Sequence, residues 1–246
     1  MKGFLQEYGI IMVVVAIVLG MLAFGKTGYA KSIQDAILGS ADHIVETGEN
    51  IVPKPAKASD IIEIEGTKYV VLKECEGYQA LVMTASDIGN KVFQSKYDSN
   101  TYLRPDGQNA NTYEGSEIDN YLENEWYNSL SSTMKSAIQS TNIKQASYNY
   151  FLNKQETGYN GQVYNTISRH VFLPSIDEVG KAFLNGDGIW TRDSYQGHAK
   201  YAMHLEPVLG RSDAGNVDST MVGVCPAFVI DLSQVDYKTV GHTDYK

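Results

Sequence analysis

Cysteine is scarce in this sequence, with Cys75 and Cys225 the two copies in 246 residues. The pair has no Cys-x-x-Cys spacing and no histidine close by in sequence, which argues against a thiolate zinc site or a redox dithiol. Two interpretations stay open: one disulfide that joins an early strand to a late one, or two buried free thiols. Sequence spacing does not decide between them, because a disulfide depends on local geometry.

Basic clusters and catalytic motifs are missing as well. The chain has 20 Lys and Arg against 29 Asp and Glu, a formal net charge of -9. A nucleic-acid partner is not expected, because binding to phosphates requires a basic face. The five histidines are scattered, and no metalloprotease, nucleophile-elbow, P-loop or dinucleotide motif occurs. The sequence therefore predicts no enzyme, no catalytic residues, no cofactor and no metal site.

Charge is absent from residues 8–25, where branched aliphatic side chains dominate. As a helix this segment spans about 27 Å, which matches the hydrocarbon core of a bilayer. A cleaved signal peptide is the alternative, although its apolar region is usually shorter. An apolar stripe continues the helix toward residue 49, where it packs on neighbouring copies or on the protein's own domain. We expect a transmembrane helix over 1–52, a proline-containing linker over 53–59 and a globular domain over 60–246.

The first residues resemble a pilin. Met-Lys-Gly at 1–3 looks like a short prepilin leader, followed by Phe4, the acidic Glu7 and the apolar helix. In type IV and Flp-type pilins an acidic residue near this place pairs with the amino terminus of a neighbouring subunit. Glu7 is the fourth residue of the expected mature chain, whereas the family has the acid at the fifth. The resemblance implies that Phe4 and Glu7 take part in self-assembly at a membrane.

The globular domain opens and closes with strand signals. Residues 61–72 predict two β segments about a turn, and residues 78–83 predict a third. Residues 224–232 predict a final buried strand, because they are almost entirely apolar. The domain is therefore expected to begin with a meander and to end with a core strand.

Helical spacing appears in the middle of the domain. Apolar residues over 114–138 recur at helical intervals, with a break near Ser131 where a new N-cap is expected, so two helices are predicted. Residues 142–188 are polar and loop-rich. Within them Ser175 precedes Glu178 by three positions, which is the spacing of a capping box at the start of a helix.

Several landmarks recur in the order of a known family. They are Trp126, Phe-Leu-Pro-Ser-Ile-Asp-Glu at 172–178, Ile-Trp-Thr-Arg-Asp at 189–193, and the strand at 222–233. This order looks like a bacterial family of extracellular domains whose fold is similar to C-type lectins. That fold is shared with formylglycine-generating-enzyme-like domains and with the variable proteins of diversity-generating retroelements. The resemblance covers roughly 61–233, and Cys225 stands where the family has arginine. Together with the expected N-terminal helix, the resemblance implies an α+β protein: a long N-terminal helix followed by a C-type-lectin-like domain.

Trp190, Arg192 and Phe228 are expected to be structural. Alternation along a strand puts Trp190 and Arg192 on one face, where the guanidinium stacks on the indole or reaches a carboxylate such as Asp231. A ligand-binding role for the same two residues is the alternative.

Residues 193–222 show little periodicity and are rich in side chains that contact ligands adaptably. We expect loops here that form the ligand face, with tyrosines as rigid anchors and polar residues as adaptable contacts. The predicted ligand-binding residues are Tyr195, His198, Tyr201, His204, Arg211, Asp213 and Asn216. In retroelement variable proteins the matching region carries the diversified residues, whereas ordinary solvated loops are the alternative.

The sequence thus predicts a binding protein at the cell membrane or on a surface filament, with its C-terminal domain extracellular. The expected ligand is an extracellular protein or glycan, and the expected role is adhesion or recognition. The alternative function is a structural pilin subunit that carries the domain as a decorating head.

Overall fold

The computed structural model of the protein describes residues 56–146, 164–179, 188–195, 198–206 and 211–243. They belong to one compact unit, Pro55–Lys246. The predicted N-terminal helix, with Phe4 and Glu7, lies outside the described residues. Among those residues no helix is long and apolar enough to cross a membrane. The described residues therefore do not support the predicted membrane or filament location.

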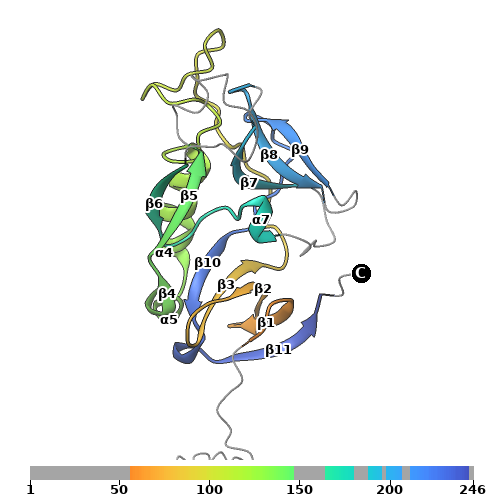
Figure 1. The fold of residues 1–246 in the computed structure, drawn as a ribbon. Coiled ribbons are helices and arrows are strands. Elements are labelled where there is room, and N and C mark those ends of the chain that lie inside the picture. Colours follow the sequence, from red (N-terminus) through yellow and green to blue (C-terminus); the bar gives the residue numbers. More distant parts are fainter. Residues whose placement is uncertain (1–55, 147–163, 180–187, 196–197, 207–210, 244–246) are drawn as a thin grey trace, which may run out of the picture. The chain divides into compact units, whose positions relative to one another are not determined.

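The largest sheet contains the strands that open and close the domain (Figure 1). All its pairs are antiparallel, in the order β11-β1-β2-β3-β10-β4. The bounds are β1 Asp60–Ile64, β2 Thr67–Glu74, β3 Gln79–Thr84, β4 Ile138–Gln139, β10 Ala227–Asp231 and β11 Tyr237–His242. A short 3-10 helix, η4 Leu232–Gln234, separates β10 from β11.

The opening strands and the last core strand agree with the sequence prediction. Glu65 and Gly66 both have positive φ angles, 50° and 80°, so a two-residue turn connects β1 to β2. Apolar residues on β2, β3 and β10 are buried and form the centre of the core. The predicted strands over 61–72 and 78–83 are therefore confirmed, as is a core strand within 224–232. The expectation that the domain ends with that core strand is wrong, because the exposed edge strand β11 follows it.

The helical segment lies beside the sheets and breaks where the sequence predicted. It consists of α3 Glu117–Asn120, the π-helix η1 Tyr121–Trp126, α4 Tyr127–Ser129 and α5 Ser132–Ala137. Ser116 caps α3 by accepting from the N–H of Asp119, and Ser131 caps α5 by accepting from the N–H of Met134. The two predicted helices and their break are confirmed.

Two smaller sheets contain the predicted strand around Trp190 and Arg192, which is β7, and four further strands in regions where the sequence predicted loops. β5 Thr141–Ala146 pairs with β6 Tyr164–Arg169, and β7 Ile189–Ser194, β8 Tyr201–Glu206 and β9 Arg211–Asn216 form a three-stranded sheet. The loop prediction for 193–222 is wrong at β8 and β9, which are a pair of antiparallel strands. The second of them, Arg-Ser-Asp-Ala-Gly-Asn, has no large apolar residue that would reveal a strand.

The fold class also needs correction. Strand accounts for 42% of the structure, and the longest continuous helical run, residues 117–129, has 13 residues. The described residues are therefore mostly β and contain no long helix, so the predicted α+β class is wrong for this part of the chain. The helical spacing over 114–138 correctly indicated the helical elements at 117–137. These elements are a small part of a structure that consists mainly of strands.

Both cysteines are free thiols, so the disulfide interpretation is wrong. Cys75 is half-buried, whereas Cys225 is fully enclosed beside β10. Burial raises the pKa of the Cys225 thiol to about 12. Cys225 therefore stays protonated at neutral pH and acts as a small apolar residue of the core.

Candidate functional site

Trp190 on β7 is held firmly in the core of the domain. Its side chain is fully buried, and its indole N–H donates to the carbonyl oxygen of Lys91 at 2.8 Å. The ring meets Phe93 edge to face at 5.7 Å between centroids. A Cβ atom added to Gly215 on β9 would lie 3.1 Å from the same indole, so glycine leaves room for the Trp190 ring against β9.

Arg192 is buried two residues further along β7 and joins three segments. Its guanidinium donates to the carbonyls of Lys144 and Leu173, and it forms an ion pair with Glu178 at 2.5 Å. Glu178 also completes the predicted capping box, since it accepts from the N–H of Ser175 while Ser175 accepts from the N–H of Glu178.

The suggested partners of Arg192 were therefore wrong. Asp231 accepts hydrogen bonds from Ser233 and Gln234 within its own turn. The aromatic ring beneath the guanidinium is Phe172, at 5.5 Å, instead of the Trp190 indole. Arg192, like Trp190, fixes the sheet that carries the candidate site.

Asp193 follows Arg192 and makes the stability of this region depend on pH. Desolvation raises the pKa of its carboxyl, although the carboxylate accepts from the N–H of Ile176 at 2.7 Å. The folded state then holds the proton more tightly than the unfolded state, so Asp193 costs stability as the pH rises from its ordinary pKa through the raised one.

An Asp193→Asn variant is expected to remove this dependence, because the amide keeps an acceptor and does not titrate. The free energy of unfolding of the variant minus that of the wild type should increase from about pH 4 upward and then level off. Urea denaturation at several pH values measures this difference. A difference that stays flat or falls with rising pH would contradict the assignment.

At one end of the domain, aromatic side chains from two segments form a continuous surface. We call it the tyrosine surface and define it by Tyr97, Tyr102, Tyr195, His198 and Tyr201. Successive rings contact one another: Tyr97 with Tyr102 at 5.9 Å, Tyr102 with His198 at 4.6 Å, His198 with Tyr201 at 5.6 Å, and Tyr201 with Tyr195 at 5.9 Å. Tyr195 and His198 are exposed, and the other three rings are half-buried.

Asn111 holds the part of the tyrosine surface that follows β7. Its buried side-chain amide nitrogen donates toward three backbone carbonyls, those of Tyr195, His198 and Tyr201, at 3.2, 3.3 and 2.8 Å. In return, the hydroxyl of Ser194 donates to the carbonyl of Asn111 at 2.7 Å. Three rings of the surface are thus anchored to one buried residue.

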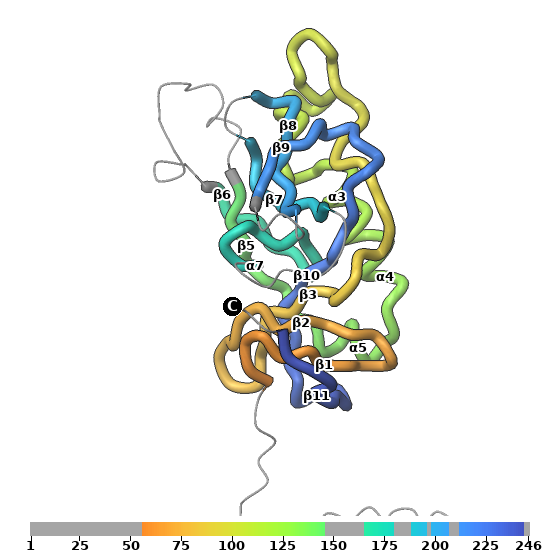
Figure 2. The backbone as a smooth tube through the Cα atoms, turned by 90° about the vertical axis from the view of Figure 1, so that its right-hand side faces the viewer, coloured from red at the N-terminus to blue at the C-terminus, as the bar shows by residue number. Residues whose placement is uncertain are grey.

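The other part of the surface is a turn that projects beyond β8 and β9 (Figure 2). Asp98 closes this turn by accepting from the N–H groups of Asn100 and Thr101. Tyr97 donates its hydroxyl proton to Asp218 at 2.9 Å, and burial together with this bond raises the pKa of Tyr97 to about 12. The turn is therefore tied to the chain that follows β9.

Tyr102 has a positive φ of 55°, which is unfavourable for a residue with a large side chain. Its backbone is held there by two hydrogen bonds, from its own N–H to the Asp98 carbonyl at 2.7 Å and from the Ala110 N–H to its carbonyl at 2.9 Å. Such strain persists where the surroundings enforce it, and it is concentrated at functional sites. The strained backbone of Tyr102 therefore supports a functional role for its ring.

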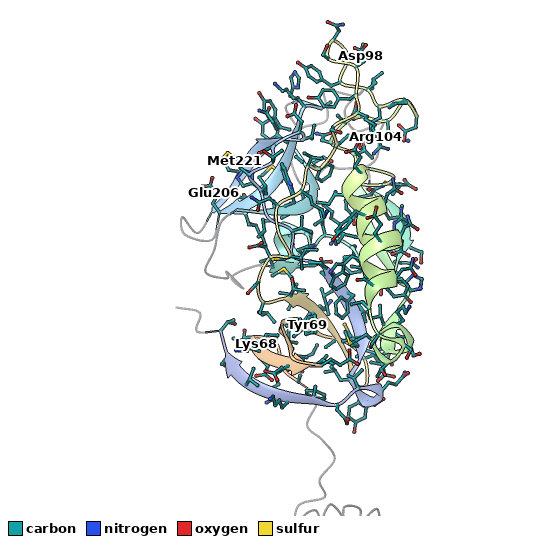
Figure 3. All side chains as sticks on the ribbon, turned by 180° about the vertical axis from the view of Figure 1, so that it is seen from behind. Lys68, Tyr69, Asp98, Arg104, Glu206 and Met221 are labelled. Carbon is teal, nitrogen blue, oxygen red and sulfur yellow. The ribbon has the colours of Figure 1, made fainter. Side chains whose placement is uncertain are left out.

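An open depression of about 510 Å³ lies next to these rings. It is lined by Lys96, Tyr97, Asp98, Thr101, Leu103, Arg104 and Pro105. Arg104 is buried and clamps the loop through Asp106 and the carbonyls of Thr112 and Glu114. Figure 3 shows Asp98 at the end of the domain that lies opposite Lys68 and Tyr69 of β2.

The family comparison covers this region. The family described as "Domain of unknown function (DUF6273)" matches residues 81–219, more than half of the chain. The chain belongs to this family. No curated protein and no solved structure is significantly similar to it, and no match is to a pilin or a C-type-lectin domain. The DUF6273 match runs from β3 to the turn after β9, so it contains the complete tyrosine surface.

The structure brings together part of the predicted ligand-binding set within the DUF6273 region. Tyr195, His198 and Tyr201 belong to the tyrosine surface, and Asn216 pairs with Tyr201 across β8 and β9. His204 instead meets Trp190 at 6.0 Å and is mostly enclosed. Asp213 pairs with His204, three positions along the ladder from the pair of Tyr201 with Asn216, and Arg211 pairs with Glu206 at the far end of the same ladder.

Sequence reasoning missed Tyr97 and Tyr102. Both lie in the run Lys-Tyr-Asp-Ser-Asn-Thr-Tyr at 96–102, where two large rings stand among small polar residues. That composition is the same signal that identified Tyr195 and Tyr201. In the described part of the DUF6273 domain and its flanks, no three His, Cys, Asp or Glu side chains are grouped so as to hold a metal ion.

Proposed function

We propose that this protein is a recognition domain that binds a protein partner through the tyrosine surface. The observation that carries the proposal is the unbroken series of ring contacts from Tyr97 to Tyr195, formed by two segments nearly a hundred residues apart in sequence. Tyrosine is suited to such a surface, because it offers a large apolar area, a polar tip and only two side-chain torsions to order.

Rigid support favours binding at this place. Asn111 holds the backbone of Tyr195, His198 and Tyr201, and the bond between Tyr97 and Asp218 fixes the projecting turn. Binding to groups that are already ordered loses less conformational entropy than binding to free loops. The tyrosine surface is thus preorganised for binding.

The shape favours a macromolecule over a small molecule. Sites for small molecules bury most of the ligand in an enclosed cavity, whereas the depression beside the rings is open. Exposed Tyr195 and His198 extend the contact area outside that depression. A protein segment that lies across the rings would bury the depression and the exposed side chains of Tyr195 and His198 together.

A random peptide library displayed on phage tests the proposal. We expect the wild-type domain to enrich peptides that bind it, and the Tyr195→Ala/Tyr201→Ala variant to bind the same peptides at least tenfold more weakly. The matched control is Tyr78→Ala/Tyr237→Ala, which removes two half-buried tyrosines outside the surface. The proposal fails if no peptide is enriched, or if the enriched peptides bind the first variant as well as the wild type. If the domain binds immobilised glycans through the same rings but binds no peptide, the ligand belongs to a different class.

Tyr102→Gly separates binding from stability. Glycine adopts the positive φ of this position at little cost, so the melting temperature should stay the same or rise by a few degrees. Peptide binding should weaken, because the ring between Tyr97 and His198 is lost. Calorimetry and a binding titration on the same sample measure both effects. A large loss of stability would show that Tyr102 is a structural residue.

A further inference from the structure

Carboxylates border the tyrosine surface. Asp218 accepts the hydroxyl proton of Tyr97, and Asp98 lies in the turn between Tyr97 and Tyr102. The N–H groups of Thr101 and Asn100 donate to Asp98 and hold the pKa of its carboxyl below its usual value. Asp98 is therefore ionised at any physiological pH. An aromatic surface with negative charge at its border favours a positively charged ligand group, since the ring faces are themselves electronegative.

The protein's own chain already places a cation on one of these rings. The ammonium of Lys200 lies over the ring of Tyr201, 6.0 Å from its centroid. The backbone N–H of Lys200 donates to the ring nitrogen Nδ1 of His198 at 3.1 Å, which keeps the lysine within the surface. This distance is at the outer limit of a cation–π contact, so the contact is weak and an external cation can replace it.

The other basic groups nearby do not occupy a ring in this way. Arg104 is buried and paired with Asp106 at 2.7 Å. Lys96 is exposed and lines the open depression. Lys200 is thus distinguished from Lys96 by its position over a ring and not by its charge.

We propose that the tyrosine surface binds a cationic group of its partner, the ammonium of a lysine or the guanidinium of an arginine, and that Lys200 holds this position in the free protein. The inference rests on the proposed function and specifies the chemistry that the partner presents. Lys200 then acts as an internal competitor, which weakens binding of the partner's cation without preventing it.

Choline and its uncharged carbon isostere, 3,3-dimethylbutan-1-ol, test this inference in a nuclear magnetic resonance titration of the full chain. The two probes have the same shape and differ in charge. We expect choline to shift the ring signals of the tyrosine surface saturably, and the isostere to leave them unchanged. Lys200→Met should tighten choline binding by about two- to fivefold, which is the worth of one exposed cation–π contact. Lys96→Met removes the same charge without uncovering a ring and should have a smaller effect.

Two outcomes would overturn the inference. The first is an equal response to choline and to the isostere, or no response to either. The second is an equal effect of Lys200→Met and Lys96→Met, which would show that only net charge matters. In either case, peptides that still depend on Tyr195 and Tyr201 would leave the proposed recognition function intact. If no such peptide is found, the proposed recognition function itself is contradicted.

Discussion

Replacing Phe228 with alanine is expected to lower the free energy of unfolding by about 3 to 5 kcal/mol. Phe228 is fully buried on β10, which pairs with both β3 and β4. Its ring meets Tyr69 edge to face at 5.4 Å and lies 6.1 Å from the ring of Trp126. The variant loses the transfer free energy of the ring and leaves a cavity that the central strands cannot easily close.

Urea denaturation followed by tryptophan fluorescence measures this loss. Val240→Ala is the matched control, since Val240 is an apolar residue on the edge strand β11 and is 41% exposed. The control should change the free energy of unfolding by no more than about 0.5 kcal/mol. A Phe228→Ala variant that unfolds at the urea concentration of the wild type would show that β10 is not the core strand described above.

The ion pair between Arg192 and Glu178 is expected to have the second large effect. Arg192→Leu should cost about 3 to 5 kcal/mol, because it leaves the carbonyls of Lys144 and Leu173 and the Glu178 carboxylate without their donor. Glu178→Gln should cost less, about 1 to 2 kcal/mol, since the Glu178 side chain is 25% exposed and water can replace part of the interaction.

The double variant identifies the coupling between these two residues. If they act as one pair, the loss in Arg192→Leu/Glu178→Gln should be smaller than the sum of the two single losses by more than about 0.5 kcal/mol. Chemical denaturation of all four proteins measures this non-additivity. Simple additivity would mean that Arg192 stabilises the fold through the backbone carbonyls alone.

Sequence reasoning found the elements whose pattern is local. The opening strands alternate or run apolar, the final strand is apolar throughout, and Ser131 and Ser175 precede helical segments with capping residues in place. Strands that are mostly polar were missed. In β5 and β6, for example, Ile143 and Ile167 are a buried cross-strand pair among polar neighbours. One large aliphatic residue per strand does not establish a period.

Only the part of the candidate site whose residues lie close together in sequence was predicted. Tyr195, His198 and Tyr201 lie close together in sequence, so their clustering was visible there. Tyr97 and Tyr102 reach them only through contacts between distant segments, such as the ring contact of Tyr102 with His198. Arg192 was recognised as structural, but its partner Glu178 was not, because nothing local relates β7 to the short helix α7, Ile176–Val179, that contains Glu178.

The most direct test of the recognition surface is to observe where a bound peptide changes the protein. Nuclear magnetic resonance spectra of the domain, labelled on its tyrosine and histidine rings, would be recorded while a peptide selected from the library is added. The account predicts that the largest shifts occur at Tyr97, Tyr102, Tyr195, His198 and Tyr201, with little change at Tyr69 and Tyr78 in the six-stranded sheet region. Shifts confined to Tyr69, Tyr78 or the edge strand β11, with the tyrosine surface unchanged, would contradict it.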